Sequence, residues 1–448
     1  MNKKGLQFVY RCTYVAAVGG LLFGYDTAVI SGAIGFIQKK YTLSPAQTGW
    51  AASCALIGCI IGAMFAGPVS DKTGRKKVLI VSALAFALSS FGIMIPWSQE
   101  AFVLFRIIGG IGIGIASMIA PLYISEIAPA PIRGRLVSIY QMGIVCGILV
   151  VYFVNAGIAD LYTEQWNIDN GWRWMFGSGL LPSILFLLLL AIVPESPRWL
   201  AANKRLPEAN HILVKINGPE EAATELHAIQ KELMTKEGSF ADLLQPDMRR
   251  SLLIGIVLAI FSQVTGMNAI LYYAPEIFKS TGDGSSSAMF QTILIGIINL
   301  LFTIVAIKYA DSWGRRKLLL IGAAGMACCL AIIGGAFYLH ATKSYLILVA
   351  ILAYIACFAI SLGPMTFVVV SEIFPTHIRG KAMSVCIFFL WVSVYIVSQT
   401  FPMLRSAIGE AITFWIYMVM SVLCCAFVWK LVPETKGKTL EEIAASWK

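Results

Sequence analysis

The sequence predicts an all-α membrane protein with twelve transmembrane helices, arranged as two pseudo-symmetric six-helix bundles. Three observations carry this prediction: an apolar composition, a series of long apolar segments, and a set of motifs that occurs twice. Of the 448 residues, 58% are hydrophobic and only 13% are charged. A soluble chain carries about 25% charged residues. The chain therefore has too little charge for a soluble protein of this size.

Twelve apolar segments are long enough to cross a bilayer as helices, which takes about 20 residues each. They are residues 12–36, 47–69, 78–97, 101–125, 136–158, 174–193, 251–275, 288–307, 318–339, 345–370, 382–404 and 411–430. A polar stretch separates the sixth segment from the seventh. We expect an N-terminal bundle over residues 1–194, a cytoplasmic linker with short helices over 195–250, a C-terminal bundle over 251–435 and a cytoplasmic tail over 436–448.

Lysine and arginine are concentrated in alternate connections between the segments. These residues are Lys3, Lys4, Arg11, Lys72, Arg75, Lys76, Lys77, Arg133, Arg135, Arg315, Arg316, Lys317, Arg379 and Lys381. Because positive charge marks the cytoplasmic side, we expect a multi-pass protein of the cell inner (plasma) membrane with both termini in the cytoplasm. The net charge of +10 then reflects topology, with membrane lipid and not nucleic acid as the partner.

Enzymatic and metal-binding patterns are missing from the sequence. It contains no HExxH, GxSxG, Walker A or Rossmann fingerprint, and its four histidines are scattered. The ten cysteines form no CxxC pair, and nearly all lie in apolar segments, where they pack as small apolar residues. We expect no enzyme activity, no metal and no cofactor, and no obligate protein partner is indicated.

Three motifs of the first half recur in the second half in the same order. The matches are Asp71 to Lys77 with Asp311 to Lys317, Ser125 to Gly134 with Ser371 to Gly380, and Pro194 to Ser196 with Pro433 to Thr435. The chain is thus two six-span halves in the same orientation. Such parallel repeats are typical of carriers that work by alternating access.

The repeated turns bring carboxylates and guanidiniums to the ends of helices. Charge-assisted bridges between neighbouring helices would latch the inner side, and they must break when the carrier switches. The predicted members of this inner gate network are Asp71, Gly74, Arg75, Glu126, Arg133, Asp311, Arg315, Glu372 and Arg379. We expect the two glutamates to bridge to Arg133 and Arg379. The alternative is that these charges only set topology and anchor the helices.

Two full charges stand out within the apolar segments: Asp26 in the first and Arg106 in the fourth. A charged side chain at mid-bilayer costs about 2.5–3.5 kcal/mol, so each requires a partner or a purpose. An aspartate that pairs with arginine when ionised, and releases it when protonated from outside, would couple transport to protons. The alternative is a fixed buried ion pair.

In contrast to the charged pair of the first half, the seventh, eighth, tenth and eleventh segments hold uncharged polar groups. These are Gln263, Thr265, Asn268, Gln291, Asn299, Thr366, Ser393 and Gln399, accompanied by the aromatic residues Tyr272, Phe367 and Trp391. An ionic substrate would require a countercharge. Amides and aromatic rings suit a small neutral sugar or polyol, which is hydrogen-bonded at its edges and stacked on its faces.

Together these motifs resemble the sugar porter family of the major facilitator superfamily, close to the bacterial proton-coupled xylose and galactose transporters. The resemblance is carried by Gly19 to Gly32, the two Asp-x-x-Gly-Arg turns, Pro194 to Leu200, Gln263 to Pro275 and Pro433 to Gly437. It implies proton-coupled import of a monosaccharide by alternating access, with Asp26 as the proton-binding group. It also implies sugar contacts or gate residues at Phe23, Gln141, Gln263, Asn268, Tyr272, Asn299, Gly363, Phe367 and Trp391.

The chain departs from the family pattern at four positions around the expected sugar site. Ser262, Ile148 and Leu390 stand where the family has glutamine, and Phe367 stands where it has tryptophan. Fewer amides suit a substrate with fewer hydroxyls, a different stereochemistry or more apolar character than the common pentoses and hexoses, because an unpaired hydroxyl in a dry pocket costs about 1–3 kcal/mol. A passive sugar or polyol facilitator is the nearest alternative function. A drug–proton antiporter and a receptor built on a transporter fold are less favoured.

Overall fold

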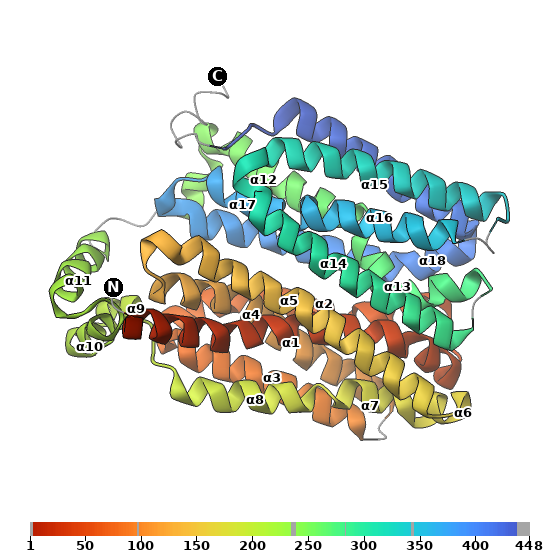
Figure 1. Ribbon diagram of the computed structural model, residues 1–448, viewed down its shortest axis with the longest axis horizontal. Helices are drawn as coiled ribbons and strands as arrows, with labels where there is room; N and C mark the ends of the chain where they lie inside the picture. The colour runs from red at the N-terminus through yellow and green to blue at the C-terminus, as the bar shows by residue number, and fades with distance from the viewer. Residues whose placement is uncertain (1–2, 96–97, 234–238, 283, 342–344, 437–448) are drawn as a thin grey trace. The chain divides into compact units, whose positions relative to one another are not determined.

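The computed structural model describes residues 3–95, 98–233, 239–282, 284–341 and 345–436, apart from the side chains of 130, 232, 246–247, 286, 310–312 and 376–377. In this part of the chain all regular structure is helical (Figure 1). Eleven helical stretches are long and apolar enough to cross a membrane. One of them, α18 (Thr376–Leu431), covers two of the predicted segments and contains the non-helical residue Gly409 between them. The all-α prediction is confirmed.

The first half consists mainly of long helices. They are α1 (Lys3–Tyr41), α2 (Pro45–Thr73), α3 (Arg75–Met94), α4 (Gln99–Ile127) and α5 (Arg133–Leu161), with the short η1 (Ala130–Ile132) before α5. The sixth segment is built in pieces: α6 (Glu164–Trp166), the π-turn η2 (Asn167–Gly171), α7 (Trp172–Gly177) and α8 (Leu180–Ile192). Both α4 and α8 pack against α3.

Short helices follow the sixth segment, as the polar linker predicts. They are α9 (Pro197–Ala202), α10 (Leu206–Asn217), α11 (Pro219–Leu233) and η3 (Phe240–Leu244). The amphipathic α10 buries Ala209, Ile212, Leu213 and Ile216, which follow the helical repeat. We call the helix ends that carry the clustered lysines and arginines the inner ends, since charge predicts them to be cytoplasmic, and the opposite ends the outer ends.

The second half repeats the helical pattern but interrupts it more often. Its helices are α12 (Pro246–Val264), α13 (Met267–Ser280), α14 (Ser285–Trp313), α15 (Arg315–Tyr338), α16 (Leu346–Ile360), α17 (Leu362–Glu372) and α18. The break between α12 and α13 lies at Gly266, whose φ of 98° favours glycine. A second break, between α16 and α17, lies at Ser361. Discontinuous helices of this kind form substrate sites in carriers, because they free backbone and amide groups inside the membrane.

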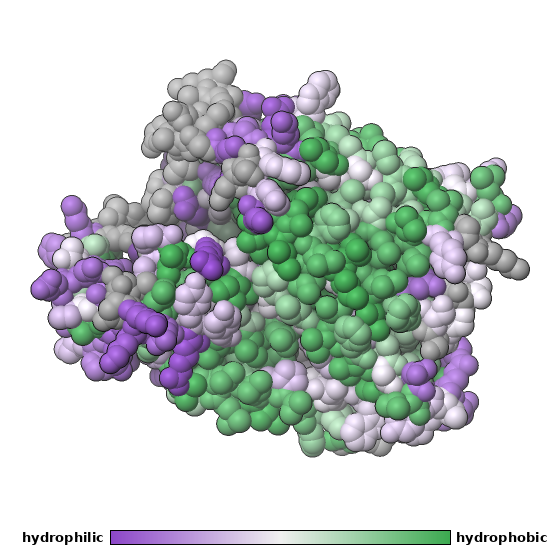
Figure 2. Space-filling view, in the orientation of Figure 1, coloured by the Kyte–Doolittle hydropathy of each residue, from purple (hydrophilic) through white to green (hydrophobic). Residues whose placement is uncertain are grey.

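Many large apolar side chains remain exposed on the long helices. On α3, for example, Val81, Leu84, Leu88 and Phe91 follow the helical repeat, and between 50% and 54% of each is exposed. Figure 2 shows hydrophobic residues over the long helices and hydrophilic residues gathered over α10 and α11, at the left of the view. This is the surface of a multi-pass membrane protein, where lipid covers the apolar side chains.

The helices form two compact units. One comprises residues 1–27, 57–148 and 176–237, and the other comprises 28–56, 149–175 and 238–448. The second unit therefore joins the outer parts of α1, α2 and α5 to the whole second half. These units describe packing and not the sequence repeat, so the predicted boundaries at 194, 250 and 435 stay a prediction.

Candidate functional site

The two predicted membrane charges meet inside the first unit. Arg106 Nη1 of α4 lies 2.9 Å from Asp26 Oδ2 of α1 and 3.3 Å from the carbonyl oxygen of Asp26. Asp26 is 8% exposed and Arg106 only 1%. The guanidinium also lies over the ring of Phe176 of α7, 5.0 Å from its centroid. A buried pair of this kind is sensitive to the protonation of its acid, because loss of either charge leaves the other uncompensated.

Glycines bring the helices around this pair close together. A Cβ at Gly58 of α2 would lie 2.1 Å from the carbonyl oxygen of Ile107, next to Arg106. A Cβ at Gly114 of α4 would lie 2.3 Å from the carbonyl oxygen of Cys59. Only glycine allows α2 and α4 to approach this closely. The ion pair thus lies in a closely packed part of the first unit.

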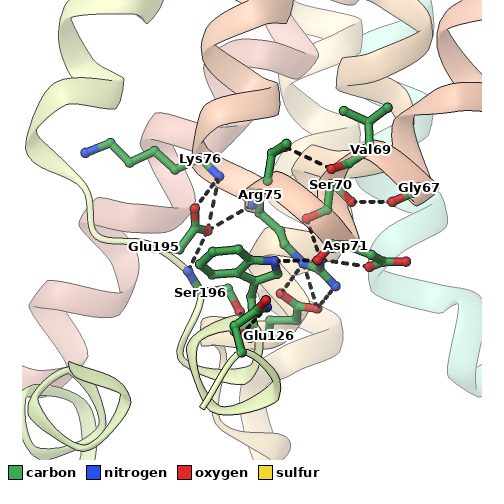
Figure 3. Close-up of polar contacts among 12 residues, drawn as sticks. Gly67, Val69, Ser70, Asp71, Arg75, Lys76, Glu126, Glu195 and Ser196 are labelled. Carbon is green, nitrogen blue, oxygen red and sulfur yellow. Dashed lines mark hydrogen bonds and ion pairs between the residues drawn. The ribbon is translucent and has the colours of Figure 1, made fainter. Parts of the chain in front are cut away.

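A cluster of charged residues joins the inner ends of the first half (Figure 3). Arg75 donates through Nη2 to Glu126 Oε1 at 3.0 Å and through Nη1 to Asp71 Oδ1 at 2.8 Å. Glu195 accepts from the backbone N–H groups of Arg75 and Lys76, at 3.0 and 3.1 Å. Its carboxylate therefore caps the positive N-terminus of α3. Gly74 makes room for it, since a Cβ there would lie 2.2 Å from Glu195 Oε2.

The second half repeats this cluster with the corresponding residues. Arg315 Nη2 donates to Glu372 Oε1 at 3.0 Å. Glu434 accepts from the backbone N–H groups of Arg315 and Arg316, at 2.9 and 3.2 Å, and so caps α15 as Glu195 caps α3. A Cβ at Gly314 would lie 2.7 Å from Glu434 Oε2. The side chain of Asp311, a predicted member, lies outside the described residues.

The predicted pairing within the gate network requires a correction. Glu126 and Glu372 pair with Arg75 and Arg315, and no ion pair of Arg133 or Arg379 occurs among the described residues. Instead, Arg133 Nε donates to the carbonyl oxygen of Ala128 at 3.4 Å, and Arg379 Nε to that of Phe374 at 3.3 Å. Each arginine thus donates to a carbonyl just beyond the end of the preceding long helix. Whether it belongs to the gate stays a prediction.

Glu195 and Glu434 are functional candidates that the sequence reasoning missed. Their only signal was the repeated Pro-Glu-Ser or Pro-Glu-Thr motif after the sixth and twelfth segments. The motif does not indicate a capping role, because the helix that each glutamate caps lies about 120 residues earlier in the chain (|i−j| = 119 or 120).

In the second unit, predicted sugar-binding amides meet at the break between α12 and α13. Asn268 Nδ2 donates to Gln263 Oε1 at 2.6 Å, and Gln263 Nε2 donates to Ser262 Oγ at 3.0 Å. The Ser262 hydroxyl in turn donates to the carbonyl oxygen of Ala259 at 2.7 Å. Where the family pattern has a second glutamine, this chain therefore has a short residue that orients Gln263. The hydroxyls of Thr265 and Thr366 are buried without a hydrogen-bond partner in the described part of the chain.

The other predicted sugar contacts are divided between the two units. Phe23 on α1 and Gln141 on α5 are half-buried in the first unit. The second unit holds Tyr272, Asn299 and Trp391, which are 4%, 6% and 4% exposed, and Phe367, which is 42% exposed. Gly363 lies in the first turn of α17, directly after the Ser361 break. Of the departures, Ile148 and Leu390 are buried apolar residues.

The outer parts of α2 and α18 are joined within the second unit by Gln399. Gln399 Oε1 accepts from Ser53 Oγ at 2.8 Å, and its Nε2 donates to the carbonyl oxygen of Ala46 at 2.9 Å. A Cβ at Gly49 would lie 2.2 Å from the Gln399 carbonyl oxygen. The adjacent Ser398 carbonyl accepts from Tyr273 of α13 at 2.9 Å. The sequence reasoning grouped Gln399 with cavity amides, whereas the structure places it in this outer contact.

Paired charged turns on two homologous halves, with polar amides at breaks between membrane helices, define a secondary transporter of the major facilitator type. Residues 12–447 match the family described as sugar (and other) transporter. The chain is 44% identical to the arabinose-proton symporter of Bacillus subtilis, over 99% of this chain and 96% of that protein. It is 42% identical to the D-xylose-proton symporter of Escherichia coli, over 98% and 96%.

Solved structures agree with these relatives. The inward open conformation of the xylose transporter from Escherichia coli matches with a TM-score of 0.87 and 42% identity, over 98% of this chain and 100% of that chain. The same symporter bound to 6-bromo-6-deoxy-D-glucose matches with a TM-score of 0.82 and 41% identity, over 99% and 100%. The chain belongs to the sugar transporter family, as the sequence predicts, and is not an enzyme.

Proposed function

We propose that this protein imports a monosaccharide together with protons by alternating access. The buried pair of Asp26 and Arg106 carries the proposal. A neutral sugar supplies no charge, so accumulation against a gradient requires a titratable group whose protonation changes the helix packing. Asp26 is such a group, and relatives named as arabinose-proton and xylose-proton symporters support the same coupling.

The geometry supports a simple cycle. Ionised Asp26 holds α1 against α4 through Arg106, and a proton from the outside removes the charge that Arg106 requires. The released helices can then rearrange, while the charged clusters at the inner ends open and close. Sugar binding adds its own preference for one arrangement. A proton alone or a sugar alone would then be carried inefficiently, which is the condition for coupling.

The substrate that fits best is a small neutral sugar. Gln263 and Asn268 offer amide groups at a helix break, and the segments around them carry no full charge in their apolar bodies. Arabinose and xylose are the first sugars to test, because two of the most similar relatives are named for them. The shortened side chain of Ser262 and the apolar Ile148 and Leu390 favour a ligand with few hydroxyl groups.

The distribution of lysine and arginine supports a position in the cell inner membrane with both termini and α9–α11 in the cytoplasm. In this orientation the charged clusters around Arg75 and Arg315 lie at the cytoplasmic exit. Cysteines introduced near the termini should then react only with reagents that reach the cytoplasm. Labelling from outside in intact cells would contradict this orientation.

Uptake into proteoliposomes tests the coupling. Arabinose and xylose are offered with and without an inward proton gradient, to the natural protein and to Asp26→Asn. We expect accumulation by the natural protein only with the gradient. Asp26→Asn should lose accumulation but retain exchange of internal for external sugar. Equal accumulation by both proteins would refute the coupling role, and gradient-independent equilibration by the natural protein would identify a passive facilitator.

A further inference from the structure

Protonated Asp26 requires a hydrogen-bond acceptor that the ion pair with Arg106 does not provide. A neutral carboxyl group carries one O–H donor, and a buried donor without an acceptor is costly. Arg106 offers no acceptor, since guanidinium nitrogens only donate. If the proposed proton coupling holds, on which this inference rests, some other group beside Asp26 must accept the hydrogen bond of the new O–H.

Ser89 of α3 lies at this point with an unused hydroxyl group. Its residue is 0% exposed, and its Oγ has no hydrogen-bond partner in the described part of the chain. It shares a small space with Asp26 that exists because residue 109 of α4 is glycine. The Ser89 Oγ lies 2.5 Å, and Asp26 Oδ2 3.4 Å, from the position that a Cβ of Gly109 would occupy.

We infer that Ser89 is a positioning residue that accepts the hydrogen bond of protonated Asp26, in the space that Gly109 leaves open. In the arrangement seen here Asp26 is paired with Arg106, and the Ser89 hydroxyl makes no hydrogen bond to any described residue, so it is available for the other protonation state. The proton comes from the outer solution, one O–H bond forms on the carboxylate, and no other covalent bond changes.

The groups around Asp26 leave Ser89 as the suitable acceptor. The charged and titratable neighbours on the packed helices are Arg106 of α4 and the buried thiol of Cys59 of α2. A thiol is a weak acceptor. Tyr25, next in the chain, already pairs its hydroxyl with Ser178 Oγ at 2.6 Å. When the ion pair opens, Arg106 keeps the ring of Phe176 as a partner.

The test compares Ser89→Ala with Ser82→Ala as a matched control. Ser82 lies two turns away on the same face of α3 and is equally buried, but its hydroxyl already donates to the carbonyl oxygen of Gly112 at 2.7 Å. Removing the Ser89 acceptor disfavours the neutral carboxyl. The pH midpoint of gradient-driven uptake should therefore fall by about half to one pH unit in Ser89→Ala, and it should not move in Ser82→Ala.

A spectroscopic measurement separates this role from ordinary packing. In infrared difference spectra, the C=O stretch of protonated Asp26 is assigned by its loss in Asp26→Asn. We expect this band to shift in Ser89→Ala and to stay in place in Ser82→Ala. Gly109→Ala gives a second variant, because its methyl group would displace the Ser89 hydroxyl and lower the pH midpoint in the same direction.

The outcomes are distinguishable from those of the proposed function. An unchanged or raised midpoint in Ser89→Ala, an unmoved infrared band, or an equal shift in Ser82→Ala would each overturn the role of Ser89. None of these results would affect coupling through Asp26. Conversely, full gradient-driven accumulation by Asp26→Asn would refute coupling itself, and the role of Ser89 with it.

Discussion

The two halves of this protein are alike at their inner ends and differ inside the membrane. Arg75, Glu126 and Glu195 in the first half have the same contacts as Arg315, Glu372 and Glu434 in the second. Both sets join three helix ends around one arginine. The duplication has thus preserved the charged residues that join these helix ends.

Inside the membrane the first half holds a buried charge pair, Asp26 and Arg106, whereas the second half holds amides at a helix break. A charge pair senses protons, and amides bind a neutral ligand without responding to pH. We infer that coupling lies in the first half, that the second half supplies the amides for recognition, and that both halves share one design at their inner ends.

The largest effect is expected from Arg106→Met. The substitution leaves Asp26 buried without its partner, and breaking a buried pair costs about 3–5 kcal/mol. Thermal unfolding in detergent should occur at a clearly lower temperature. Asp26→Asn combined with Arg106→Met should recover part of this loss, because neither charge is then left alone. A double variant that is less stable than Arg106→Met would contradict a compensating pair.

The next effect compares the two charged clusters through Glu126→Gln and Glu372→Gln. Each change removes the charge from a hydrogen bond to arginine, which contributes about 1.5–3 kcal/mol. The Glu126 side chain is 9% exposed and that of Glu372 is 30% exposed, so the first change should be more destabilising. The unfolding temperature and the sugar uptake rate of both variants are measured and compared. Equal losses would show that burial does not distinguish the two clusters.

Much of this arrangement could be predicted from the sequence, because the features that stand out in it are those with a large free-energy cost in a membrane. Charges at Asp26 and Arg106 are expensive in a membrane, so their pairing could be predicted from their depths, and the structure brings them together. The twelve segments follow from length and hydropathy alone. The likeness of the two charged clusters could be predicted from the repeated motifs.

What could not be predicted depends on how helices rotate and where they break. Both Arg75 and Arg133 lie near Glu126 in any reading of the motifs, and only the rotation of α3 and α5 decides that Arg75 is the partner. The orientation of Gln399 could not be predicted either, since an amide in an apolar segment can face a cavity or a neighbouring helix. The break at Ser361 has no glycine or proline at its own position to indicate it.

Recognition is tested by Gln263→Ala against Asp26→Asn. Loss of Gln263 removes one amide from the proposed sugar site and takes the hydrogen-bond acceptor of Asn268. We expect sugar affinity to fall about tenfold, or about 1.4 kcal/mol. Asp26→Asn should leave affinity at a fixed acidic pH nearly unchanged. Calorimetric titration of detergent-purified protein measures both. If instead Asp26→Asn weakened sugar binding more than Gln263→Ala, recognition and coupling would not be divided between the halves.

The smallest effect is expected at the outer ends, from Gln399→Leu. Leucine has similar size but cannot bond Ser53 or Ala46, and the net loss of such hydrogen bonds is about 0.5–1.5 kcal/mol. The outer parts of α2 and α18 should then separate more often. A cysteine at Ala46 should react several-fold faster with a membrane-impermeant thiol reagent applied from outside.

Thr400→Val serves as the control, because the Thr400 hydroxyl donates within its own helix, to the carbonyl oxygen of Ile396 at 2.7 Å. Since Tyr273 joins α13 to the adjacent Ser398 carbonyl, bound sugar should slow the labelling in the natural protein more than in Gln399→Leu. Labelling that is insensitive to both changes would show that Gln399 does not hold the outer ends together.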